Sequence, residues 1–306
     1  MKRKTYDLAV AYRIFPKISK IPPIFQNDKY KLAHLCLKSF KGSLGSLNAK
    51  IYALLDNCPP EYEDLFNRYF EKENLEIIRL NGVGNQATFK LQLDILLEQN
   101  YSEIVYFAED DYYYFPNQFE KMINFLKKHS DVDFVTPYDH LDYYVQPLHD
   151  YKSILKNYSD KQWKKVGSTC CTFLTSKTTL NKTKKVFNKY SYVKNSFDRA
   201  IFKRNRYLNH IFRDFLSKAN DADIWLSLTK ANVFKLFKII RFKIQTIKSF
   251  RYLFRAWRYH WKQILFGKKW NLYCPKPTIA THMESKKLSP DINWEEIFKK
   301  ESVVIN

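Results

Sequence analysis

The segment "IVYFAEDDYYYFP", residues 104–116, places three carboxylates in a row directly after an apolar run that predicts a buried strand. Three like charges at the edge of an apolar sheet are costly unless a cation or a proton compensates them. A hard divalent cation such as Mg²⁺ or Mn²⁺ prefers carboxylate oxygens and commonly shares its shell with substrate phosphates. A solvated acidic turn is the alternative, but the apolar run before the carboxylates and the aromatic residues after them favour a cation site.

On both sides of this segment, strand patterns alternate with helix patterns. The sequence predicts strands at residues 6–14, 49–57, 75–80, 102–110 and 132–138, and helices at residues 30–40, 60–74, within 81–100 and at 116–129. This alternation predicts an α/β fold with a mostly parallel sheet covered by helices on both faces. Ligands of such sheets bind beyond the carboxyl ends of the strands, where Asp56, the loop 81–85 and the triplet Glu109–Asp111 fall.

The second half of the chain is less regular. Residues 162–177 predict a loop and a strand, and residues 218–231 predict a helix with acidic residues in its first turn. With 306 residues, 45% of them apolar, the chain can bury a real core. The simplest division is a main domain over residues 1–230, a basic helical region over 231–270, and a C-terminal segment over 271–306 that returns to the ligand-binding edge.

Cysteine content and apolar runs limit the class of protein. Five cysteines with no C-x-x-C pair argue against a zinc site and a disulfide framework, and indicate a reducing compartment. No run of about 18 apolar residues exists, so no transmembrane helix is expected. Asp7 and Arg13 interrupt the N-terminal apolar stretch, which makes it a poor signal peptide.

The net charge of +21 is concentrated in one part of the sequence. Between Ile224 and Met283 there is no Asp or Glu, while the same residues include 13 Lys and Arg. Such a block indicates a phosphate-rich partner, either nucleic acid or an anionic membrane.

Residues 232–266 of this block predict a helix with a cationic stripe. Basic residues recur there at spacings of three and four, at Lys248, Arg251, Arg255, Arg258 and Lys262. Apolar side chains cover much of the remaining surface, namely Phe250, Leu253, Phe254, Trp257, Trp261 and Ile264. This pattern is typical of a helix in the membrane interface that is attracted to anionic lipid. A helix packed on the main domain and a helix that binds nucleic acid are the alternatives.

The segment "VYFAEDDYYYFP" resembles the D-x-D region of GT-A-fold glycosyltransferases, in particular the family 2 type of bacterial surface-glycan synthesis. The resemblance implies a GT-A-like catalytic domain, a nucleotide-sugar donor and a bound Mn²⁺ or Mg²⁺. It places Glu109 at the first acidic position and Asp111 at the metal-chelating one, with Asp110 between them at the donor. Asp56 matches the position that holds the nucleotide base or ribose. The loop "NGVGN", with Asn81, Gly84 and Asn85, matches the segment near the nucleotide.

Two further segments extend the resemblance. "NDADIWLSL", residues 220–228, is similar to the family's E-D-x-D-L-x-x-R stretch, which places the catalytic base on Asp221. Asn220 departs from the usual Glu and Ser227 from the usual Arg, and acidic residues at a helix start also have a purely electrostatic explanation. "ATHMES" offers His282 to complete the metal or diphosphate shell, although a lone histidine can be structural. "VGSTCCTFLTSK" resembles the segment that lines the acceptor side.

The resemblance implies a metal-dependent glycosyltransferase that acts on a hydroxyl of a glycan or lipid-linked acceptor, with inversion at the anomeric carbon. Its expected product is a cell-surface polysaccharide or lipooligosaccharide. We expect a cytoplasmic protein, peripherally associated with the inner face of the membrane, and no nucleic-acid partner. Two other functions stay open: a nucleotidyl or sugar-phosphate transferase that uses the same carboxylates, and a nucleic-acid-binding protein that uses the basic residues 224–283.

Overall fold

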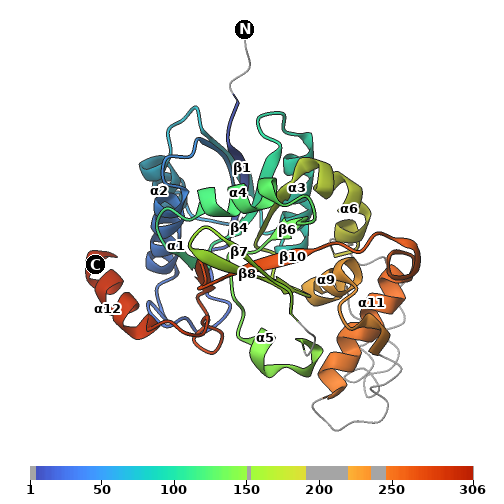
Figure 1. Cartoon of the computed structure of the whole chain (residues 1–306). Helices are drawn as coiled ribbons and strands as arrows, with labels where there is room; N and C mark the ends of the chain where they lie inside the picture. The colour runs from blue at the N-terminus through green and yellow to red at the C-terminus, as the bar shows by residue number, and fades with distance from the viewer. Residues whose placement is uncertain (1–4, 150–152, 191–219, 236–245, 306) are drawn as a thin grey trace, which may run out of the picture.

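The computed structural model describes residues 5–149, 153–190, 220–235 and 246–305 (Figure 1). Their main feature is a nine-stranded sheet. In spatial order its strands are β3 (Leu75–Leu80), β2 (Ala49–Asp56), β1 (Leu8–Ile14), β4 (Ile104–Glu109), β9 (Phe173–Ser176), β6 (Phe134–Val135), β10 (Leu272–Lys276), β8 (Lys161–Val166) and β7 (Leu155–Tyr158). Within this sheet β9 and β8 run against the other strands. The predicted α/β class with a mostly parallel sheet is therefore confirmed.

Helices cover both faces of the sheet, as predicted (Figure 1). One face carries α1 (Lys29–Leu44), α2 (Glu61–Tyr69) and α4 (Phe119–Lys128), and the other carries α3 (Asn85–Glu98), α6 (Lys177–Tyr190) and α9 (Asp221–Thr229). On the first face Tyr12 of β1 packs edge-on against Phe40 and Phe66. On the second, Phe89 of α3 stacks on Phe107 of β4. Every residue of β1 and β2 is buried, because both faces are covered.

The later strands are shorter than the sequence pattern predicts. The strand expected at residues 132–138 is reduced to β6, although Thr136 N–H still donates to the backbone oxygen of Tyr273 at 2.9 Å. Its neighbour β10 comes from the C-terminal segment and lies between β6 and β8. Residues Leu272–Lys276 of the C-terminal segment thus form a strand inside the sheet. The short elements are α5 (Asp142–Val145), η1 (Pro147–His149) and η2 (Val233–Lys235).

A second, two-stranded sheet joins distant parts of the chain. The tyrosine run after the acidic triplet forms β5 (Tyr112–Tyr114), which pairs with β11 (Ala280–His282) in antiparallel register. This register sets His282 opposite Tyr112, one residue after the triplet. The C-terminal helix α12 (Trp294–Ile305) then packs on α1 through Trp294 and Phe298.

Helix α11 (Thr246–Phe266) packs against α9 at the edge of the molecule (Figure 1). It is interrupted at His260, whose φ of −132° and ψ of 22° are not helical. The predicted cationic stripe was wrong in one respect: Arg255 is buried, because it forms an ion pair with Asp223 of α9. Residues 236–245 of the predicted basic segment lie outside the described residues. No helix in the described part of the chain is long and apolar enough to cross a membrane.

Candidate active site

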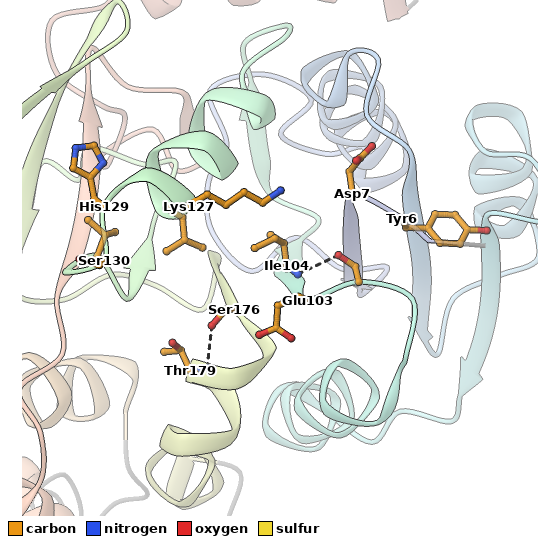
Figure 2. A pocket seen from close by; sticks show the side chains of 12 residues that line it. Tyr6, Asp7, Glu103, Ile104, Lys127, His129, Ser130, Ser176 and Thr179 are labelled. Atoms are coloured by element: carbon orange, nitrogen blue, oxygen red, sulfur yellow. Dashed lines mark hydrogen bonds between the residues drawn. The ribbon is translucent and has the colours of Figure 1, made fainter. Parts of the chain in front are cut away.

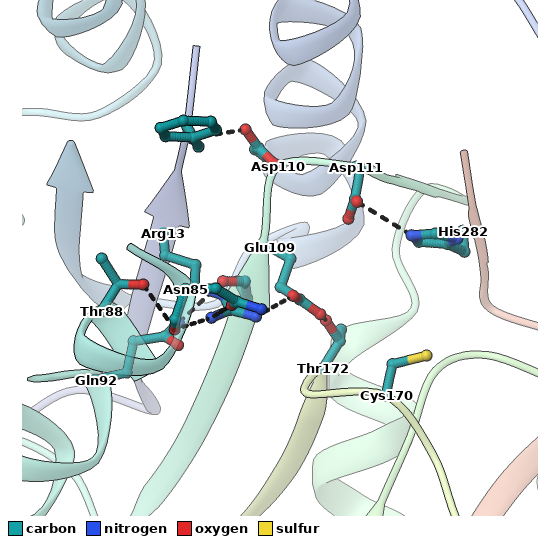
Figure 3. A network of polar contacts seen from close by, with 12 residues as sticks. Arg13, Asn85, Thr88, Gln92, Glu109, Asp110, Asp111, Cys170, Thr172 and His282 are labelled. Atoms are coloured by element: carbon teal, nitrogen blue, oxygen red, sulfur yellow. Dashed lines mark hydrogen bonds and ion pairs between the residues drawn. The ribbon is translucent and has the colours of Figure 1, made fainter. Parts of the chain in front are cut away.

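The acidic triplet lies at the carboxyl end of β4, as predicted, and its three side chains face three different partners (Figure 3). Arg13 approaches from the end of β1, Lys29 from the start of α1, and His282 from β11. The three carboxylates therefore differ in how completely the protein compensates them.

Glu109 is compensated by Arg13, its register neighbour on β1. Arg13 Nη2 pairs with Glu109 Oε1, and Thr172 Oγ1 donates a hydrogen bond to Oε2 at 2.9 Å. Arg13 Nη1 also donates to the backbone oxygen of Asn85 at 2.8 Å, which ties β1 to the first residue of α3. Burial alone would lower the pKa of Arg13, but the Glu109 carboxylate raises it above its ordinary value. Both oxygens of Glu109 are thus engaged by the protein itself.

Asp110 is compensated by Lys29. Lys29 Nζ lies 2.8 Å from Asp110 Oδ2, and the backbone N–H of Phe15 donates to the same oxygen at 3.0 Å. Burial raises the pKa of Asp110, and the Lys29 ammonium opposes that rise. The pair ties the ends of β4 and β1 to the start of α1. Asp110 therefore has a structural role in this geometry.

Asp111 is only half compensated. His282 Nε2 donates to Asp111 Oδ2 at 3.0 Å, while Oδ1 is buried and has no hydrogen-bond partner among the described residues. Burial would raise the pKa of Asp111, but His282 lowers it to about 2. Burial would lower the pKa of His282, and the Asp111 carboxylate raises it instead. A buried ionised oxygen without a partner is costly, so Oδ1 marks a place where a further cation would be stabilised.

Asp111 fits a divalent cation whose shell is shared with a ligand, and His282 would join that shell as a neutral imidazole, without the proton that its Nε2 donates to Asp111 here. The described residues contain no cluster of three or more His, Cys, Asp or Glu side chains that could hold a metal by themselves. A cation such as Mg²⁺ commonly takes one or two carboxylates from the protein and the rest from substrate phosphates and water. The unpartnered Asp111 Oδ1 is the observation that fits such a cation.

Asp56 lies at the end of β2, where the sequence places it, and holds the glycine loop. Its Oδ1 accepts from the backbone N–H of Val83 and its Oδ2 from that of Gly84, both at 2.8 Å. Both oxygens are therefore used to fix the loop. Contact of Asp56 with a nucleotide stays a prediction.

The loop itself has the backbone shape that its glycines suggested. Gly82 has φ 68° and Gly84 has φ 85°, values that favour glycine. Asn81 is exposed at the start of the loop, and Asn85 begins α3 beside Arg13. The roles of Asn81, Gly84 and Asn85 toward a nucleotide stay predictions.

A second acidic segment begins α9. Asn220 caps this helix by accepting from the N–H of Ala222 at 3.0 Å, and Asp223 accepts from the N–H of Asn220 at 2.7 Å. This reciprocal arrangement is a capping box. Asp223 also pairs with Arg255 Nε at 2.8 Å, and both side chains are almost fully buried. Burial raises the pKa of Asp223, and Arg255 opposes the rise.

Asp221 has no ion-pair partner among the described residues, although it lies in the field of the triplet. Burial raises its pKa to about 6, and the negative charge of Glu109 contributes to the rise while Arg13 opposes it. Trp225 Nε1 on the same helix donates to the backbone oxygen of Cys170 at 3.3 Å, which fixes α9 beside the loop that carries Thr172. The structure therefore brings Asp221 near Glu109, and its carboxyl can exchange a proton near neutral pH.

Three residues of this site were not identified from the sequence. Arg13 and Lys29 supply the cations for Glu109 and Asp110, and Thr172 supplies a hydroxyl. Arg13 left a signal, since an arginine at the end of a buried strand needs a carboxylate partner. Lys29 and Thr172 carry no comparable signal in the sequence.

A hollow of about 460 Å³ lies at the opposite edge of the sheet, near the amino ends of β1 and β4 (Figure 2). Its two acidic residues already bind backbone N–H groups: Asp7 accepts from Asn48 at 2.9 Å, before β2, and Glu103 accepts from Thr178 at 2.9 Å, at the start of α6. None of the predicted site residues lines it. The candidate active site is therefore the carboxyl-end cluster.

No protein-family model matches the sequence, and no curated protein matches it. Among solved structures, S. aureus TarS 1–349 in complex with UDP is 10% identical, covers 82% of this chain and 91% of its own, and has a TM-score of 0.42. The same protein with UDP-GlcNAc is 11% identical over 80% of this chain and 78% of its own, with a TM-score of 0.41. A 4-diphosphocytidyl-2C-methyl-D-erythritol synthase from Anaerococcus prevotii is 13% identical over 64% of this chain and 82% of its own, with a TM-score of 0.35.

Proposed function

We propose that this protein is a metal-dependent glycosyltransferase with a GT-A-like fold. It would move a sugar from a nucleotide-sugar donor to a hydroxyl of a glycan or lipid-linked acceptor, with inversion, in the synthesis of a cell-surface polysaccharide or lipooligosaccharide. The observation that carries the proposal is the half-compensated Asp111 beside His282, at the ligand-binding edge of a mostly parallel sheet.

Asp111 and His282 would hold Mn²⁺ or Mg²⁺. When bound, such an ion neutralises the charge that develops on a diphosphate leaving group. Glu109 and Asp110 would not bind the ion, because they are already paired with Arg13 and Lys29. These two ion pairs fix the strand end, so that Asp111 points toward His282 without rearrangement.

Asp221 would act as the general base. It takes the proton from the acceptor hydroxyl as that oxygen attacks the anomeric carbon of the donor sugar. Its pKa of about 6 suits the role, because the carboxylate is ionised at neutral pH and still basic enough to accept a proton. A base on the side of the acceptor gives in-line attack, from which inversion follows.

The loop 81–84 would bind the nucleotide with its backbone. Asp56 fixes the shape of this loop by accepting from the N–H groups of Val83 and Gly84, and glycine at positions 82 and 84 would allow the backbone to come close to a ligand. The N-terminus of α3 follows the loop directly, and helix N-termini favour phosphate. Arg13, whose charge is paired with Glu109, holds Asn85 at the start of this helix.

The proposal is tested by offering the purified protein a panel of UDP-, GDP- and CMP-sugars with Mn²⁺, with Mg²⁺ and with EDTA. The expected result is metal-dependent hydrolysis of one donor class, with release of the nucleotide and a rise in thermal stability on binding. Asp111→Asn should abolish both effects, whereas Asp7→Asn, at the opposite edge of the sheet, should leave both unchanged.

Two results would contradict the proposal. Release of pyrophosphate from a nucleoside triphosphate and a sugar phosphate would assign the site to nucleotidyl transfer. Donor turnover that is unchanged in EDTA would remove the cation from the mechanism.

A further inference from the structure

The outward side of α11 presents a row of large apolar and cationic side chains. Trp261, Leu265 and Phe266 are 46%, 48% and 79% exposed. Arg258 and Lys262 are exposed in the same two turns, and Lys268 and Lys269 follow directly after the helix. Side chains of this size are seldom left in water together without a partner surface.

The inward side of the same helix is fully occupied. Leu253, Ala256 and Ile264 are buried in a cluster with Leu226 of α9. Arg255 forms the buried ion pair with Asp223. Among the described residues, the helix is therefore already packed on α9 through these buried side chains, while Trp261, Leu265 and Phe266 stay exposed.

The chain segment that contains this row carries basic residues and no acidic one. No Asp or Glu occurs from Ile224 to Met283. Lys268 pairs with Asp133 at 2.9 Å but keeps 58% of its side chain exposed. The surface thus combines the exposed cations Arg258, Lys262 and Lys269 with aromatic and aliphatic groups, which is the composition of an interfacial membrane anchor.

We infer that the end of α11 docks the protein on an anionic lipid bilayer. Trp261, Leu265 and Phe266 would enter the headgroup region, and Arg258, Lys262 and Lys269 would contact lipid phosphates. This surface does not depend on the reaction at Asp111 and stands if that reaction is a different one. Under the proposed function, a bilayer at this surface would hold a lipid-linked acceptor close to α11. Helix α11 packs against α9, and α9 begins at Asp221.

Two other occupants fit the row less well. Nucleic acid gains from aromatic stacking and basic groups, but exposed Leu265 contributes nothing to stacking on bases. A second copy of the chain would place two cationic rows against each other, which costs free energy. The bilayer uses the aliphatic, aromatic and cationic side chains together.

The experiment measures co-sedimentation of the full-length protein with vesicles of phosphatidylcholine alone and of phosphatidylcholine with phosphatidylglycerol at three to one. The protein should bind the anionic vesicles and bind them less in high salt. The triple variant Arg258→Gln, Lys262→Gln, Lys269→Gln should lose about 10²-fold in affinity, since each basic residue near such a surface contributes a factor of about five. The variant Trp261→Ser, Phe266→Ser should lose the part of the binding that salt does not remove.

A matched pair of tryptophan variants locates the contact. Brominated lipid should quench the protein's fluorescence, and Trp261→Phe should reduce that quenching, whereas Trp270→Phe, at a position 6% exposed, should not. Arg255→Gln should leave vesicle binding unchanged below its unfolding temperature, because Arg255 faces Asp223 and not the outside.

Three outcomes would overturn the inference. They are equal binding to neutral and anionic vesicles, binding to neither, and quenching that Trp261→Phe leaves intact. Binding of single-stranded nucleic acid that the triple variant abolishes, with no vesicle binding, would assign the row to nucleic acid instead.

Discussion

Two acidic segments of this protein differ in how neighbouring cations compensate their carboxylates. They are residues 109–111 at the end of β4 and residues 221–223 at the start of α9. In the first, two carboxylates are matched by Arg13 and Lys29, and the third is half matched by a histidine. In the second, Asp223 is matched by Arg255, and Asp221 has no ion-pair partner among the described residues. The first segment therefore has two carboxylates paired with Arg or Lys and the second has one, and in each segment one carboxylate has no such partner among the described residues.

The two segments also differ in the pKa of the carboxyl group that has no Arg or Lys partner. Asp111 has its pKa lowered to about 2 by His282, so it stays ionised and suits a cation. Asp221 has its pKa raised to about 6 by burial, so it suits proton transfer. Under the proposed function, these two environments are the reason for placing the cation at Asp111 and the general base at Asp221.

The largest expected effect is that of Asp111→Asn. This change removes the negative charge that would hold the cation, which is worth several kcal/mol of charge stabilisation, so transfer should fall by about 10⁴-fold or more. Steady-state turnover measures the loss, and circular dichroism checks that the fold is kept. Turnover within tenfold of the unchanged protein would make Asp111 a structural residue like Asp110.

Asp221→Asn should have the next largest effect. Loss of a general base costs about 10² to 10⁴-fold in rate, and kcat should carry that loss while the affinity for donor changes little. Pre-steady-state transfer and donor titration separate the two. A large loss of donor affinity with a modest loss of rate would move Asp221 from the acceptor to the donor.

The pH dependence of kcat/KM should report the ionisation of Asp221. Because the base must be ionised, kcat/KM should fall tenfold per pH unit below about 6, and it should level off above that pH. The residual activity of Asp221→Asn should lack this limb. A profile that is flat from pH 5 to 7 in the unchanged protein contradicts the assignment.

Asp110→Asn should affect stability more than catalysis. Removing one partner of a buried ion pair leaves Lys29 uncompensated and costs about 3 kcal/mol of the free energy of unfolding, which urea denaturation measures. The double variant Lys29→Met, Asp110→Asn should recover most of that loss. Turnover of folded Asp110→Asn should stay within about tenfold. A loss of turnover like that of Asp111→Asn, without loss of stability, would place Asp110 at the cation.

Much of the fold was predictable, because the first strands are continuous apolar runs that end in polar residues. The bounds of β1, β2, β3 and β4 lie within two residues of the predicted ones. Other features leave no local pattern. The pairing of β5 with β11 brings His282 to Asp111, 171 positions away in the sequence, and no periodicity within either segment encodes this contact.

The ion-pair partners of the basic residues in the site and in α11 could not be predicted from the sequence either. The spacing of Arg255 placed it on a solvated or lipid-facing stripe, and only the packing of α11 on α9 shows that it faces Asp223. Arg13 appeared in the sequence only as an interruption of an apolar run. An ion pair between distant elements depends on tertiary packing, so the sequence shows a charge without showing its partner.

The central claim is that Asp111, and not its two neighbours, holds the cation that binds the donor diphosphate. Calorimetric titration of Mn²⁺-dependent nucleotide binding tests it most directly, with whichever of UDP, GDP and CDP binds tightest. The account predicts that Mn²⁺ strengthens binding at least tenfold in the unchanged protein and in Asp110→Asn, and not at all in Asp111→Asn. An equal Mn²⁺ effect in Asp111→Asn, or its loss in Asp110→Asn alone, would contradict the account.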